Sequence, residues 1–158
     1  MAVNLSILVG TMTGTAEIVA EEISDKLSEA GVEVEVTPMD ELDSSVFAKG
    51  GLFLICTSTY GQGDVPDNAL KLYEDLKEKR PDLKSVKYGV VALGDRTYSD
   101  TFTHGGMRFD ELMTELGAQR VGEICQHDAS AGTIPEEVGV EWAEDWAKLL
   151  PDAAEAAA

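Results

Sequence analysis

Apolar segments rich in β-branched residues alternate with amphipathic segments along the whole chain. Five apolar segments have the length of strands, and they cover residues 5–10, 32–37, 51–58, 88–94 and 120–126. Four of them are continuous or nearly continuous, as expected of parallel strands that are covered on both faces. The segment 32–37 reads VEVEVT, and its strict alternation predicts a half-exposed strand at the edge of a sheet.

Helical periodicity fills the intervals between these strands. It predicts helices over residues 16–30, 67–80, 108–117 and about 136–150, while the segment 39–50 is short and weakly patterned. In the first helix Ile18, Ala20, Ile23 and Leu27 fall near one face, and Gly31 supplies a natural stop. In the last helix Trp142 and Trp146 share a face, which favours core packing over cofactor binding.

Strict alternation of strands and helices predicts an α/β fold with three layers and right-handed crossovers. The common order for five parallel strands is 2-1-3-4-5, which places the alternating strand 32–37 at the edge. In this order strand 4 separates Cys56 from Cys125, at a distance of at least about 9.5 Å, which is too long for a disulfide. The two cysteines form no CxxC pair, so the sequence indicates neither a zinc site nor a redox pair.

Composition narrows the class of partner. The chain has 158 residues, 44% of them hydrophobic, with 30 Asp and Glu against 12 Lys and Arg and a formal charge of −18. Such a surface repels nucleic acid and anionic membranes and steers the protein toward basic partners, although the charge also serves solubility, including solubility in high salt. The N-terminus lacks the pattern of a signal peptide and no window approaches about 20 apolar residues, so a cytoplasmic protein is expected.

The loop after the first strand, VGTMTGTAE, has the composition of an anion cradle. Gly10 and Gly14 allow tight turns, and the helix that starts near Ala16 aims its free amide groups at the same point. Hydroxyl donors come from Thr11, Thr13 and Thr15. The loop is neither a Walker A motif nor a GxGxxG fingerprint, and an ordinary strand-to-helix turn remains the alternative.

Two further loops are longer than the 2 to 6 residues that such a connection usually needs. STYGQGDVPDNA follows the third strand and contains Tyr60, and ALGDRTYSDTFTHGG follows the fourth and contains Tyr98. In sheets of this kind ligands bind beyond the carboxyl ends of the strands. Two tyrosines beside a phosphate cradle indicate a planar ring held between aromatic faces.

Taken together, GTMTGTAE, STYGQGDVPDNA and ALGDRTY resemble the three flavin-binding loops of the flavodoxin family, and FDELMTELGAQRVGE resembles the helix and strand that follow. The resemblance covers nearly the whole chain and is greatest to short-chain, single-domain bacterial flavodoxins and to the FMN domains of diflavin reductases. It implies a flavodoxin-like three-layer sandwich, with an FMN-binding domain at residues 1–150 and an Ala-rich C-terminal tail at 151–158.

The resemblance also implies which residues bind FMN. The phosphate lies among Thr11, Met12, Thr13, Gly14, Thr15 and Ala16. The second loop supplies Ser58, Thr59, Tyr60 and Gly61, and the third supplies Leu93, Gly94, Asp95 and Tyr98, so that Tyr60 and Tyr98 cover opposite faces of the ring. Asp128, just after the fifth strand, matches an acidic position near the flavin of diflavin relatives.

The third loop departs from the family pattern. Three residues separate Tyr98 from Phe102 where the family more often has two, and Thr103 stands where a cysteine is frequent. His104 and His127 are interpreted as surface or loop histidines rather than metal ligands, because no carboxylates accompany them at metal-site spacing.

The implied function is that of an electron carrier rather than an enzyme, working between the semiquinone and hydroquinone of FMN. Acidic surroundings oppose the second electron, and Gly61 lets the peptide beside flavin N5 rotate. The expected partners are basic proteins, namely an NADPH-dependent flavodoxin reductase and an acceptor enzyme, and the carrier is expected to be monomeric. The alternatives are an FMN-dependent NAD(P)H:quinone or nitro reductase and a regulatory domain of the response-regulator kind. The latter needs acidic residues after strand 1, where GTMTGTAE stands.

Overall fold

The computed structural model describes residues 3–10, 15–29, 31–39, 42–47, 51–57, 67–84, 86–94, 104–122, 124–128 and 135–147. Its strands are β1 (Val3–Gly10), β2 (Val32–Pro38), β3 (Gly51–Thr57), β4 (Val86–Gly94), β5 (Gln119–Arg120) and β6 (Cys125–Asp128). Its helices are α1 (Thr15–Glu29), α2 (Asp67–Lys79), α3 (His104–Glu115) and α4 (Pro135–Ala147), with a 3₁₀ turn, η2 (Ser44–Phe47). The expected tail at 151–158 lies outside the described residues.

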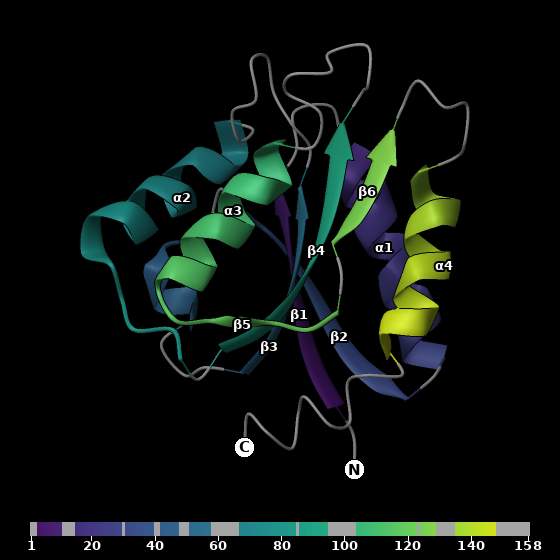
Figure 1. Ribbon diagram of the computed structural model, residues 1–158. Coiled ribbons are helices and arrows are strands. Elements are labelled where there is room, and N and C mark those ends of the chain that lie inside the picture. Colours follow the sequence, from purple (N-terminus) through teal and green to yellow (C-terminus); the bar gives the residue numbers. More distant parts are fainter. Residues whose placement is uncertain are drawn as a thin grey trace.

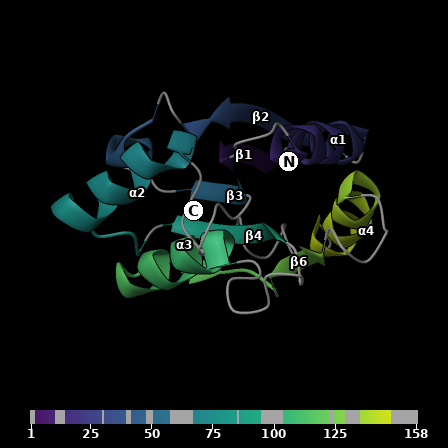
Figure 2. The same cartoon turned by 90° about the horizontal axis from the view of Figure 1, so that it is seen from above.

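One parallel sheet forms the middle of three layers (Figures 1 and 2). Its order is β2-β1-β3-β4-β5, and β6 pairs with β4 beyond β5, which confirms the predicted order 2-1-3-4-5. Helices α1 and α4 cover one face, and α2 and α3 cover the other. In the edge strand β2, Val32 is buried while Glu33 and Glu35 are exposed, as the alternating sequence predicts.

The fifth strand is the main departure from the prediction, because the expected strand 120–126 is divided into β5 and β6. Gly122 has a φ of 71°, a left-handed conformation that interrupts an extended chain. The amide of Val121 still donates to Tyr88 O at 2.7 Å, but its carbonyl accepts from Trp146 Nε1 at 2.9 Å. The last helix therefore binds the chain at the interruption.

Trp146 is in close contact with β4 at Gly89, where an added Cβ atom would lie 2.6 Å from the indole. Its side chain is buried and stacks on Trp142 with a centroid separation of 5.4 Å. This arrangement confirms the prediction that the two tryptophans serve core packing.

A polar network ties α3 to the start of the fifth strand. The buried Tyr88 hydroxyl donates to Asp110 Oδ1 at 2.7 Å, and Arg120 Nη1 donates to Asp110 Oδ2 at 2.8 Å. Burial in the first place, with the neighbouring Asp110 carboxylate, raises the pKa of Tyr88 well above its usual range. The hydroxyl therefore stays protonated and keeps its donor role at neutral pH.

Two predictions about single side chains were wrong. Ile18 was expected on the buried face of α1, but it is 51% exposed, because that face is formed by Ala16, Val19, Ala20, Ile23 and Leu27. Each helical residue turns by about 100°, which carries Ile18 away from this stripe. His127 was expected at the surface or in a loop, and it is buried on β6.

Two further predictions are confirmed, the stop of the first helix at Gly31 and the separation of the two cysteines. Helix α1 ends at Glu29, and Gly31 follows it with a φ of 92°. Cys56 and Cys125 are both free and buried, with Val91 of β4 between them in the sheet register. None of the described helices is both long enough and apolar enough to cross a bilayer.

We expect Trp146→Phe to lower the free energy of unfolding by about 1 to 3 kcal/mol, because the Val121 carbonyl loses its donor and the smaller ring leaves space against Gly89. Urea denaturation followed by circular dichroism measures the change. Trp142→Phe is the matched control, since its indole hydrogen-bonds to none of the described residues, and it should cost less than about 1 kcal/mol. Equal losses from the two variants would contradict the assignment.

We also expect both thiols to resist an aromatic disulfide reagent at pH 8 in the folded protein and to react in denaturant. Burial raises the pKa of Cys125 from 9.0 to about 11 and raises that of Cys56 further. Because these folded-state pKa values exceed the unfolded ones, the stability they contribute is complete below about pH 9 and is lost as the pH rises above it. Rapid labelling of the folded protein at pH 8 would show that the two side chains are accessible.

Candidate cofactor site

The carboxyl ends of the strands converge on one edge of the sheet. Gly10 of β1 pairs with Thr57 of β3, and Gly94 of β4 pairs with Asp128 of β6. Each of the four described α-helices begins at this edge, which is the upper one in Figure 1. The connections that follow β1, β3, β4 and β6 therefore all start within one region.

Five of the sequence-predicted site residues fall within the described chain, and all five lie at this edge. Thr15 and Ala16 open α1, Leu93 and Gly94 end β4, and Asp128 ends β6. The remaining site residues lie outside the described residues, and they stay predictions: Thr11, Met12, Thr13, Gly14, Ser58, Thr59, Tyr60, Gly61, Asp95 and Tyr98.

The start of α1 has the chemistry of a phosphate site without a cation. Ala16 is fully buried in the first turn, and the first basic residue of the helix is Lys26, in its last turn. The first amide groups of a helix have no partner within it and carry partial positive charge, so they bind anions without a lysine or arginine. The donors present at this edge therefore fit a phosphate group.

Gly10, the last residue of β1, has a packing role that the sequence did not predict. A Cβ atom added to it would lie 2.7 Å from Thr57 Oγ1 and 2.9 Å from Ala69 Cβ, distances that real Cβ atoms do not reach. Gly10 is therefore required because β3 and α2 approach the backbone of β1 closely at the entrance to the first loop.

Cys56 contacts the other end of that loop. Its Sγ donates to the carbonyl of Ala16 at 3.3 Å, within the buried interior between β3 and α1. Cys56 and Thr57 are not among the site residues that the sequence predicts. The available signal was their position as the last two residues of the third strand, directly before the second loop.

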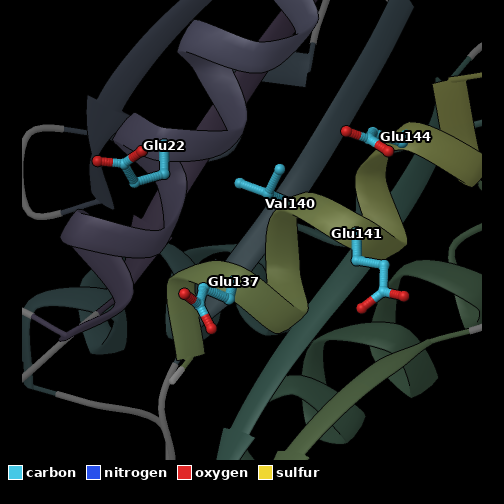
Figure 3. A pocket seen from close by; sticks show the side chains of 5 residues that line it. All are labelled: Glu22, Glu137, Val140, Glu141 and Glu144. Atoms are coloured by element: carbon cyan, nitrogen blue, oxygen red, sulfur yellow. The ribbon is translucent and has the colours of Figure 1, made fainter. Parts of the chain in front are cut away.

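A groove lies along one side of the molecule. It has a volume of about 400 Å³ between α1 and α4 and is lined by Glu22, Glu137, Val140, Glu141 and Glu144. Figure 3 shows Val140 on α4 between the carboxylates of that helix, with Glu22 opposite on α1. All the polar side chains that line the groove are carboxylates, so the groove repels a phosphate-bearing cofactor. It is therefore not an alternative to the edge where the strands end.

Acidic charge is concentrated in the same layer as this groove. Helices α1 and α4 carry ten acidic residues against one basic residue, a formal charge of −9. Helices α2 and α3 carry seven acidic residues against four basic ones, a formal charge of −3. Within the described residues, no group of His, Cys, Asp or Glu side chains is arranged to hold a metal ion.

Comparisons with known proteins agree with this geometry. The model of the flavodoxin family matches residues 7–142. Flavodoxin YqcA of Pectobacterium carotovorum is 40% identical over 146 residues, which cover 92% of this chain and 96% of the relative. The flavoprotein alpha-component of the NADPH sulfite reductase of Bacillus subtilis is 34% identical over 150 residues, 94% of this chain and 24% of that protein.

Solved structures lead to the same family. A flavodoxin mutant from Pseudomonas aeruginosa superposes with a TM-score of 0.84 at 35% identity, covering 94% of this chain and 99% of that one. Sequence, strand order and the convergence of the strand ends on one edge agree. The chain belongs to the flavodoxin family.

Proposed function

We propose that this chain binds FMN and carries single electrons between other proteins, and that it is not itself an enzyme. The observation that carries the proposal is the match to the flavodoxin family over residues 7–142, together with the start of α1 at the edge where the strands end. We further propose that residues 1–150 form one FMN-binding domain.

In this proposal FMN supplies the redox chemistry, and the chain binds and orients it. Residues 11–16 enclose the phosphate, with the amides of the first turn of α1 as donors. Tyr60 and Tyr98 shield the two faces of the ring from water, and Ser58, Thr59, Gly61, Leu93, Gly94 and Asp95 line its edge. The carboxylate of Asp128 opposes negative charge on the ring.

The charge and the exposed apolar side chains of the surface favour partner proteins that are basic and bind transiently. The charge of −9 on α1 and α4 attracts a basic protein from a distance. Among the described residues, three large apolar side chains are exposed near the site edge, each as the fourth residue of its helix: Ile18 at 51%, Leu70 at 40% and Met107 at 40%. Such side chains give a short-lived complex apolar contact area close to the cofactor. An NADPH-dependent flavin reductase as donor and a basic acceptor enzyme fit this surface.

We expect the apoprotein to bind FMN tightly in a 1:1 complex and the holoprotein to take up two electrons in separate one-electron steps. The acidic surroundings raise the free energy of the doubly reduced, anionic cofactor, so the second step has the lower potential. Fluorescence titration and potentiometry at pH 7 measure these properties. A single two-electron step would contradict the mechanism, and rapid turnover with NADPH and a quinone, without added reductase, would identify a reductase instead.

We expect the rate of electron transfer from the reduced holoprotein to cytochrome c, used as a basic probe, to fall about tenfold or more between low and high salt. At low salt the triple variant Glu22→Gln, Glu137→Gln, Glu141→Gln should lower this rate several-fold. The matched control, Glu74→Gln, Glu78→Gln, Glu111→Gln, removes equal charge from α2 and α3 and should have a smaller effect. Equal effects would show that net charge alone, not its placement, controls the encounter.

A further inference from the structure

We infer that Cys56 and Thr57, the last two residues of β3, are positioning residues that hold both ends of the phosphate-binding loop. The inference rests on the proposed binding of FMN, because the loop at 11–14 is its proposed phosphate site. Gly10 precedes this loop and Thr15 follows it, and both flanks lie within the described chain.

Neighbouring residues of a strand point to opposite faces of the sheet, so the two side chains reach different layers. Cys56 belongs to the core between the sheet and α1. Thr57 reaches the opposite layer, where it and Ala69 of α2 enclose the backbone of Gly10. These two adjacent residues of β3 therefore make contacts on opposite faces of the sheet, Cys56 with α1 and Thr57 with the end of β1.

The first contact fixes the exit of the loop. Cys56 Sγ lies 3.3 Å from the carbonyl oxygen of Ala16, and both residues are fully buried. Burial keeps this thiol protonated, so it remains a donor at neutral pH. The carbonyl belongs to the first turn of α1, so holding it sets the direction of the amide groups that we propose as phosphate donors.

The second contact lies at the entrance. Thr57 Oγ1 is 2.7 Å from the position that a Cβ on Gly10 would occupy, so the Thr57 side chain packs directly over the backbone of this glycine. Gly10 and Thr57 are also partners in the parallel pairing of β1 with β3, so the register of the two strands brings these residues together. Since residue 58 opens the second predicted loop, the same end of β3 sets the position of both loops relative to each other.

The experiment compares substitutions of two buried cysteines. Cys56→Val removes the donor and keeps a branched side chain, Cys56→Ala repeats the test without added volume, and Cys56→Ser retains a donor. Cys125→Val is the matched control, because Cys125 lies in the same core cluster and sheet register and hydrogen-bonds to none of the described residues. The readouts are the FMN dissociation constant, the ³¹P resonance of bound FMN and the unfolding of the apoprotein.

We expect Cys56→Val and Cys56→Ala to raise the FMN dissociation constant about three- to tenfold, which corresponds to the loss of one hydrogen bond, and to move the ³¹P resonance. Cys56→Ser should stay within about twofold of the wild type. Cys125→Val should leave both cofactor readouts unchanged, even where it lowers stability as much.

Two results would overturn the inference. In one, the Cys56→Val and Cys56→Ala proteins retain the wild-type dissociation constant and ³¹P resonance. In the other, Cys125→Val changes them as strongly, which would reduce the effect to general core packing. Failure of the proposed function is distinguishable, because the wild-type protein itself would then fail to bind FMN.

Discussion

Parallel hydrogen bonding between the strands is the constraint on which this molecule depends. Because β1, β3, β4 and β6 run in the same direction, each connection must return across a face of the sheet, and helices make these returns. Both faces must then be apolar, and two core clusters fill them. The same constraint brings the carboxyl ends of β1, β3, β4 and β6 and the starts of the four described α-helices to one edge, so the position of the candidate site follows from the topology.

Most of the fold could be predicted because its signals are local. Continuous apolar runs mark the central strands, and VEVEVT marks the edge strand through its alternation. The interruption of the fifth strand could not be read in this way, because Gly122 alone does not show that the chain turns there, and the donor to the neighbouring Val121 carbonyl is Trp146, far along the chain. The burial of His127 likewise follows from the sheet and not from its neighbours in sequence.

The same distinction between local and distant signals applies to the candidate site. Its three loops could be predicted from composition and order, since glycines, hydroxyls and tyrosines follow successive strands, and their site residues remain predictions. The contacts of Cys56 and Thr57 next to these loops could not be predicted. Alternation of side chains along a strand assigns the two residues to opposite faces of the sheet, but it does not show which groups they contact there. Only the packed structure places the Ala16 carbonyl against one and the backbone of Gly10 against the other.

The pairing of α1 with α4 brings like charges together, with Gly139 so close to Val19 that an added Cβ would lie 2.7 Å away. Lys26 is the only basic residue of the two helices, and its ammonium group lies 3.2 Å from Glu144. The remaining carboxylates repel one another across the groove, which opposes folding at low ionic strength. Added salt therefore has two opposite effects. It stabilises the fold by screening this repulsion, and it weakens the attraction between the protein and a basic partner.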